Sequence, residues 1–251
     1  MAKPGKKKKV LFVLEIIVLL LFIGGLYVYG QISSRLDKIE QPELKKEKIV
    51  VNQEAPKMTG YKTYVLFGID TRGEGSQYSA QNSDTIIIAS INNDTKEVKL
   101  ASVYRDTLLD IGNDTYTKAN AAYAYGGPEQ AISMLNTMLD LKITDYVTVN
   151  FNAMVAAIDA LGGLDIELKS SELDKLNQCI DEQQRVNGIP STYVYDTGVV
   201  HLDGVQATAY ARIRSTDQGD ITRAWRQRKV ISLMIEKAKS AGISKLNDCL
   251  N

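Results

Sequence analysis

The sequence predicts an α/β domain in which a mixed β-sheet is covered by helices. Runs with strand character alternate with helical runs, and one pair of strand runs is joined as a hairpin. A long amphipathic helix follows near the end of the chain. At 251 residues, the natural partition is a membrane anchor and one domain of roughly 190 residues.

The expected strands are runs of β-branched and aromatic residues. The first, residues 62–70, ends in a polar loop. Residues 85–91 and 97–103 flank the turn sequence of residues 92–95, which predicts a hairpin. Two further strands are expected at residues 146–151 and 164–168.

The expected helices are marked by apolar spacing and by their end signals. One begins at Gly126-Gly127-Pro128, with the proline in the first turn, and runs to about Asp140. A second ends at Gly162-Gly163, where glycine tolerates the left-handed conformation. The helical ranges are 126–140, 152–161, 204–211 and 221–241, while residues 170–190 are polar and are interpreted as an insertion over the domain.

The N-terminus predicts a membrane anchor. Residues 1–9 hold five lysines and no acid, and form a cytoplasmic tail. Residues 10–30 are almost wholly apolar and, at about 1.5 Å per residue, match the bilayer core of about 30 Å. A cleaved signal peptide is the alternative, but no Ala-x-Ala pattern follows Tyr29. We therefore expect a single-pass anchor, an extracytoplasmic stalk at residues 31–60 and an extracytoplasmic domain at residues 61–251.

Charge and rare residues exclude several classes of protein. The formal net charge is zero, so without its five tail lysines the chain carries a net charge of −5. A nucleic-acid-binding domain is normally basic, and that class is disfavoured. His201 is the only histidine, which excludes a zinc site built on several histidines. Cys179 and Cys249 leave a disulfide open in an exported domain.

Two aspartates follow or precede predicted strands. Asp70 ends the first strand and Asp84 precedes the next. Ligands of α/β sheets bind at strand ends, and two carboxylates with phosphate oxygens suit Mg²⁺. The alternative is that each aspartate caps a turn.

A second group of candidate site residues is basic. Arg105 and Asp106 follow the hairpin, with Lys118 after them. Arg223, Arg226 and Gln227 have the helical spacing that places them on one face near a helix N-terminus, where anions are favoured. The cluster is completed by Arg212, Arg214 and Arg228. Guanidinium groups bind phosphate in bidentate fashion, so we favour an anion site over a solvated face with surface ion pairs.

Taken in order, these motifs resemble the LytR-CpsA-Psr family across about residues 62–240. The matching motifs are Gly68-Ile-Asp-Thr-Arg72, Asp84-Thr85, Ser102-Val-Tyr-Arg-Asp-Thr107, Lys118-Ala-Asn-Ala-Ala-Tyr-Ala124, Gly126-Gly127, Leu161-Gly-Gly163, Leu202-x-Gly-x-Gln-Ala207, Tyr210-Ala-Arg-x-Arg214, Asp220-x-x-Arg223 and Arg226-Gln227. Each motif alone is weak, but the ordered set is specific.

The resemblance implies a cell-wall phosphotransferase of Gram-positive bacteria. Such enzymes move teichoic acid or capsular polysaccharide from an undecaprenyl-pyrophosphate carrier to peptidoglycan, forming a phosphodiester. It further implies an α-β-α sandwich with an apolar tunnel for the lipid. Matching positions put Asp70 and Asp84 on Mg²⁺ (or Mn²⁺), and surround the pyrophosphate with Arg105, Lys118, Arg212, Arg214, Arg223 and Gln227. Catalytic roles fall to Arg105, Arg212 and Arg214, with Asp106 as a candidate base or as a group that orients Arg105.

Three departures from the family pattern stand out. Tyr104 stands where relatives usually have proline, residues 170–190 look individual, and the chain stops at Asn251 where relatives tend to continue. A missing strand or helix there would weaken the tunnel wall. Two other functions stay open, a lipid-pyrophosphate hydrolase and a non-catalytic polyprenyl-phosphate-binding regulator, and an ordinary core is the alternative to a tunnel.

Overall fold

The computed structural model describes residues 44–56, 59–69, 81–214 and 219–248. The expected basic tail and the expected anchor at residues 10–30 lie outside these ranges. Among the helices of the described ranges, none is long and apolar enough to span a membrane.

The centre of the domain is a mixed four-stranded sheet in the order β3-β2-β1-β6. Its strands are β1 (Tyr61–Ile69), β2 (Ser83–Asn92), β3 (Val98–Val103) and β6 (Tyr146–Val149). The β2 strand pairs antiparallel with both β1 and β3, whereas β6 runs parallel to β1. The Asn92 side chain closes the β2–β3 turn by accepting from the backbone N–H groups of Asp94 and Thr95, at 2.9 Å each. The predicted hairpin and mixed sheet are confirmed.

One face of the sheet packs on the helix α2 (Ala121–Met138). Alternate residues of β1, Val65 and Phe67, are fully buried against this helix in a first core cluster. The helix begins at Ala121, five residues before the predicted start at Gly126. Gly126 and Gly127 kink it, and Gly127 has a φ of 67°, so the predicted start is the position of the kink.

Part of the expected stalk packs on the domain. Residues 44–56 contain the short 3₁₀ helix η1 (Lys46–Lys48) and lie along α2. The Val50 backbone donates to the Ser133 hydroxyl (2.9 Å) and accepts from the Asn136 amide (3.1 Å), while Ile49 is 8% exposed. Ordered structure therefore begins at least as early as Leu44, well before the predicted first strand. The few apolar residues among many lysines gave this segment no detectable periodicity.

A second core cluster is formed by the other half of the domain. Its elements are α3 (Phe151–Ala160), β7 (Leu164–Leu168), α4 (Ser170–Asn187), β8 (Gly198–Leu202), α5 (Gly204–Arg212) and α6 (Asp220–Asp248), and a short separate hairpin is made by β4 (Leu108–Asp110) and β5 (Tyr116–Lys118). The interpretation of residues 170–190 as an insertion is wrong. They form α4, whose Leu176 and Ile180 are fully buried, because four-residue spacing places both on one stripe of a mostly polar helix.

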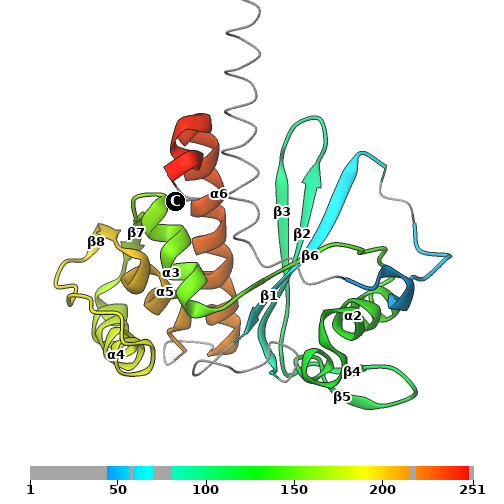
Figure 1. Cartoon of the computed structure of the whole chain (residues 1–251). Helices are drawn as coiled ribbons and strands as arrows, with labels where there is room; N and C mark the ends of the chain where they lie inside the picture. Colours follow the sequence, from blue (N-terminus) through cyan, green and yellow to red (C-terminus); the bar gives the residue numbers. More distant parts are fainter. Residues whose placement is uncertain (1–43, 57–58, 70–80, 215–218, 249–251) are drawn as a thin grey trace, which may run out of the picture. The chain divides into compact units, whose positions relative to one another are not determined.

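These elements make layers on both sides of the sheet. Figure 1 shows α2 on one side of the four strands and α3, α5 and α6 on the other, with α4 beyond them. Gly162 and Gly163, which follow α3, both have positive φ (78° and 73°), as their predicted role requires. The face of the sheet that points away from α2 borders the candidate functional site, which is described below.

Candidate functional site

Four arginines meet at the wall of one cavity of about 450 Å³. They come from three separate stretches of chain: the loop after β3, the end of α5 and the first turns of α6. The lining residues are Asp84, Thr85, Arg105, Phe151, Cys179, Glu182, Arg212, Arg214, Arg223 and Gln227. Four cations against two carboxylates give this "arginine cavity" a net positive charge in an otherwise acidic domain.

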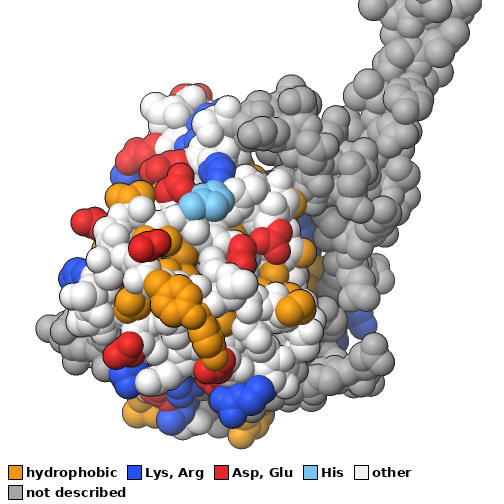
Figure 2. Space-filling view, turned by 90° about the vertical axis from the view of Figure 1, so that its left-hand side faces the viewer, with side chains coloured by type: hydrophobic (Ala, Val, Ile, Leu, Met, Phe, Trp, Pro, Cys, Tyr) orange, Lys and Arg blue, Asp and Glu red, His pale blue; other side chains and the backbone are white. Residues whose placement is uncertain are grey.

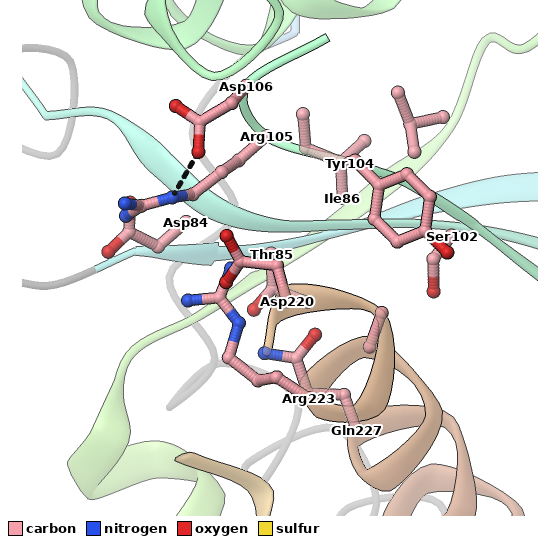
Figure 3. A pocket seen from close by; sticks show the side chains of 12 residues that line it. Asp84, Thr85, Ile86, Ser102, Tyr104, Arg105, Asp106, Asp220, Arg223 and Gln227 are labelled. Carbon is pink, nitrogen blue, oxygen red and sulfur yellow. Dashed lines mark hydrogen bonds and ion pairs between the residues drawn. The ribbon is translucent and has the colours of Figure 1, made fainter. Parts of the chain in front are cut away.

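The loop that carries Arg105 is fixed by its own backbone. The Thr107 N–H donates to the carbonyl of Tyr104 (3.0 Å), and the Asn120 N–H donates to the carbonyl of Arg105 (3.0 Å). The Arg105 guanidinium then donates through Nη1 to Asp84 Oδ1 (2.9 Å) and through Nε to Asp106 Oδ2 (3.2 Å). Figure 3 shows Arg105 between these two carboxylates. Both the backbone and the side chain of Arg105 are therefore held in place before any ligand arrives.

Asp106 lies between two cations. Its other oxygen pairs with Lys118 Nζ at 2.6 Å. The hydrogen bond from Lys118, together with the charge of Arg105, lowers the pKa of the Asp106 carboxyl below its ordinary value. Burial opposes the charge on Arg105, but Asp84 and Asp106 outweigh it and raise the pKa of the guanidinium. Lys118 lies outside the arginine cavity and is connected to it through Asp106.

Arg212 and Arg214 reach the cavity from the end of α5. The Arg212 guanidinium lies over the Phe151 ring at 4.8 Å from its centroid and pairs with Glu182 Oε1 at 3.3 Å. Arg214 is half-exposed, and its Nε lies 3.9 Å from Asp220 Oδ1. One side of each guanidinium is thus oriented by the protein.

Arg223 is the most buried arginine of the cavity. Its residue is 6% exposed, and its Nη2 lies 3.1 Å from Asp220 Oδ1. Its Nε is buried and has no hydrogen-bond partner in the described part of the chain. Burial, followed by the repulsion from Arg214, lowers the pKa of Arg223. Arg223 thus brings a largely buried cation to the cavity wall, where the charge of a bound anion would offset it.

The prediction that Arg226 shares this anion-binding face is wrong. Arg226 is 1% exposed and donates to Glu172 and to the carbonyl of Ile213, while Arg228 donates to the hydroxyl of Ser102 (2.6 Å). Three residues on a helix advance by about 300°, which leaves Arg226 about 60° away from Arg223. That rotation turns Arg226 into the core, whereas Gln227 lines the cavity as predicted.

A second, apolar cavity of about 290 Å³ adjoins the first. Five residues line both: Asp84, Thr85, Phe151, Arg212 and Gln227. The rest of the apolar wall comes from strands β1 and β6 and from three helices, and consists of Leu66, Phe67, Gly68, Ile69, Val147, Val149, Asn150, Met154, Thr208, Ala211, Val230, Ile231, Met234 and Ile235. The space between the two core clusters is therefore a cavity and not packed side chains.

Gly68 keeps the sheet side of this apolar cavity closely packed. It faces Thr85 in the β1–β2 register, and a Cβ atom at Gly68 would lie 2.8 Å from the Thr85 Cβ. No larger residue fits without a shift of one strand.

Of the two predicted metal ligands, only Asp84 lies in the described ranges. Its carboxylate lines both cavities and is 35% exposed, so oxygen ligands are available to a hard cation. Within the described residues no group of three or more His, Cys, Asp or Glu side chains could hold a metal. The donor type fits Mg²⁺ or Mn²⁺, and the pairing with Asp70 stays a prediction.

His201 lies apart from the arginine cavity. It is on β8, 60% exposed at its side chain, and its Nδ1 is 2.7 Å from Asp165 Oδ1 on β7. Figure 2 shows the face where the chain's single histidine is on the surface among mixed charges. The chain's single histidine therefore takes no part in the arginine cavity. Cys179 is a free thiol at the cavity wall, and Cys249 lies outside the described residues.

Glu182 and Phe151 line the arginine cavity but were not predicted from the sequence to do so. Glu182 was hidden by the interpretation of residues 170–190 as an insertion, although its place on an amphipathic helix was available as a signal. Phe151 was expected to end a strand, but it begins α3 and lies under Arg212. No local sequence pattern predicts the contact between Phe151 and Arg212.

The chain is similar to teichoic acid transferases. The sequence profile of the LytR_cpsA_psr family matches residues 26–251. "Polyisoprenyl-teichoic acid--peptidoglycan teichoic acid transferase TagU" of Bacillus mycoides is 32% identical over 253 residues, covering 97% of this chain and 76% of the relative. The protein of the same name from Enterococcus faecalis is 32% identical over 244 residues, covering 94% and 73%.

Solved structures show the same fold. "TagT bound to LI-WTA" aligns with a TM-score of 0.63 at 28% identity, covering 80% of this chain and 74% of that one. The family protein YwtF (TagT) "with bound octaprenyl pyrophosphate lipid" aligns with a TM-score of 0.60 at 28% identity, covering 80% and 75%. The profile match and the relatives agree with the motif order and with the mixed sheet, and the chain belongs to the LytR-CpsA-Psr family.

Proposed function

We propose that this chain transfers an anionic glycan, a teichoic acid or capsular polysaccharide, from an undecaprenyl-pyrophosphate carrier to peptidoglycan. One observation carries the proposal: a cavity with four arginines adjoins an apolar cavity through shared walls. A lipid with a doubly phosphorylated head fits that combination. Guanidinium groups bind its phosphates, and its hydrocarbon chain is more stable in an apolar cavity than in water. The named activity of the TagU relatives and the octaprenyl pyrophosphate bound to TagT support the same substrate class.

The chemistry is a displacement at phosphorus. A sugar hydroxyl of peptidoglycan attacks the glycan-side phosphorus, the bond to the bridging oxygen breaks, and undecaprenyl phosphate leaves with the electron pair. Arg105, Arg212 and Arg223 would bind the phosphates and stabilise the charge that develops on the leaving group. Such transfers depend mainly on positioning and on charge neutralisation.

Asp106 fits an orienting role better than that of a general base. Its pKa is lowered by Lys118 and Arg105, which weakens it as a proton acceptor. A loose transition state needs little help from a base, so the hydroxyl proton can pass to a phosphate oxygen. In this proposal Asp106 holds Arg105 and Lys118 at the rim of the arginine cavity.

Asp84 and Asp70 would hold Mg²⁺ or Mn²⁺. When bound, the ion supplies neutralisation of negative charge on the phosphate oxygens. Asp84 also anchors Arg105, so its carboxylate would serve the cation and the guanidinium together.

The location follows from the carrier. We propose that residues 10–30 span the cell membrane once, with the basic tail in the cytoplasm and the domain outside. An undecaprenyl carrier stays in the bilayer, so a tethered domain would meet it at high local concentration.

The direct test is transfer by the full chain in detergent micelles. A lipid-linked glycan with a radiolabel in its glycan is incubated with Mg²⁺, with and without peptidoglycan. Label should enter peptidoglycan only in the complete reaction, and Arg105→Ala and Arg212→Ala should each abolish incorporation while thermal unfolding stays cooperative. Wild-type incorporation by both variants would contradict the proposed site.

Two other functions give different outcomes in the same assay. A lipid-pyrophosphate hydrolase would release free labelled glycan without any acceptor. A non-catalytic binding or regulatory protein would bind the polyprenyl pyrophosphate tightly and release no label under any condition.

A further inference from the structure

A buried ion pair joins two helices that both carry residues of the arginine cavity. Arg226 (1% exposed) donates from Nε and Nη2 to Oε1 of Glu172, at 2.9 and 2.8 Å. Glu172 is 4% exposed, and its other oxygen accepts from the backbone N–H of Lys169 (3.0 Å). The pair joins the first turn of α4 to α6.

The third contact of Arg226 is on the segment that carries two cavity arginines. Nη1 donates to the carbonyl of Ile213 (3.0 Å), the residue between Arg212 and Arg214. Ile213 has left the helical conformation, with φ −56° and ψ 121°, and the last carbonyls of a helix have no helical partner. A side-chain donor from a neighbouring helix satisfies this one.

Stability alone does not account for such a pair. Removing two charges from water is costly, and a well-packed apolar pair of similar volume is often as stable or more stable. What an apolar pair cannot supply is the hydrogen bond that fixes the Ile213 peptide. Arg226 also lies one turn after Arg223 on α6, so it connects the arginine of α6 with those at the end of α5.

We propose that Arg226 and Glu172 form a positioning pair, which holds Arg212 and Arg214 in register with Arg223 around the pyrophosphate. The inference rests on the proposed function and concerns residues that do not touch the substrate. A misplacement of about 1 Å at a reacting centre can cost about 100-fold in rate, so a loosened Ile213 peptide is expected to be visible in turnover.

The test uses the double variant Arg226→Met/Glu172→Leu in the full chain. The single variant Arg226→Met would leave a buried carboxylate unpaired and could unfold the domain, whereas the double variant removes both charges. We expect a melting temperature at or above that of the wild type and faster deuterium exchange of the amides at residues 212–214. The turnover number should fall at least about tenfold while KM for the lipid-linked donor stays within about threefold, because the apolar cavity is intact.

Lys237→Met is the matched control. Lys237 is also a cation of α6 that donates to carbonyls at the end of a helix, those of Gly162 and Gly163 after α3, but it lines neither cavity. This variant should keep wild-type turnover and wild-type exchange at residues 212–214. If it loses turnover equally, the effect is a general loss of helix caps and the proposed pair is overturned.

Failure of the pair and failure of the proposed function are distinguishable. Wild-type turnover in a folded double variant overturns the positioning pair and leaves the function standing. If the wild-type chain transfers nothing, the proposed function fails, and the pair is decided by amide exchange. Faster deuterium exchange at residues 212–214 in the double variant, with wild-type exchange there in Lys237→Met, would then support the pair, and unchanged exchange in the double variant would overturn it.

Discussion

Substitution of Arg223 by Met should separate ligand binding from stability. The unpartnered, buried Nε of Arg223 costs about 1–3 kcal/mol in the ligand-free protein. The ion pair that would be lost, with the half-exposed Asp220, contributes about 0–1 kcal/mol. Because a guanidinium stays charged at any accessible pH, the cost is present throughout the pH range. Removing it should stabilise the fold by about 1 kcal/mol, or about 2–4 °C in melting temperature.

The same substitution should weaken ligand binding strongly. Hydrogen bonds to a charged partner contribute about 1.5–3 kcal/mol, which corresponds to about 10- to 150-fold in affinity. Titration calorimetry with octaprenyl pyrophosphate and thermal unfolding of the full chain measure the two effects. Arg185→Met, at an exposed arginine of α4 outside both cavities, should change neither quantity. An Arg223→Met chain that melts several degrees lower and binds as tightly as the wild type would refute the argument.

Three further variants probe other parts of the site. Asp106→Asn should slow transfer less than about tenfold, whereas loss of a general base costs about 10²–10⁴-fold. The lowered pKa of Asp106 keeps its carboxylate ionised at neutral pH, and the stabilisation from its ion pairs is lost only as the pH falls below the ordinary pKa of an aspartate. The transfer rate of the wild type and of the variant should therefore depend on pH in the same way between pH 5 and 8. Gly68→Ala should destabilise the fold by about 1–3 kcal/mol in denaturant titrations, because the Cβ of the new alanine would clash with the Cβ of Thr85. An unchanged denaturant concentration at the unfolding midpoint would count against the close packing of β1 and β2 at this position. Ile231→Trp should fill the apolar cavity and weaken octaprenyl pyrophosphate binding at least about tenfold, because each methylene of the lipid left in water costs about 0.8 kcal/mol. Inorganic pyrophosphate has no lipid chain and should bind to this variant as it does to the wild type. Equal losses of affinity for both ligands would exclude a separate lipid cavity.

Much of the fold could be predicted because its signals are local. Alternating β-branched residues gave β1, β2 and β3, and the side-chain chemistry of Asn92 gave the hairpin turn. The α4 helix was missed because its buried stripe is narrow and its remaining residues are polar. The β8 strand was missed because it needs β7 as its partner, a pairing that no local pattern records.

The candidate site was predicted only in part. Arg105, Arg212, Arg214, Arg223 and Gln227 were expected together, and the structure brings them to one cavity. Arg226 has the same residue type and almost the same spacing, yet it is buried against Glu172, which is 54 residues away in sequence. Helical spacing gives the direction of a side chain to within a wide angle, and only the neighbouring helix decides whether that direction meets a cavity or a core.

The proposed function requires that a pyrophosphate lie among the arginines while its lipid chain fills the apolar cavity. A crystal structure of the chain with octaprenyl pyrophosphate and Mg²⁺ would show both. We expect phosphate oxygens within hydrogen-bonding distance of Arg105, Arg212 and Arg223, and isoprenoid carbons against Val230 and Ile231. A lipid bound on another surface, with the two cavities holding only water, would contradict it.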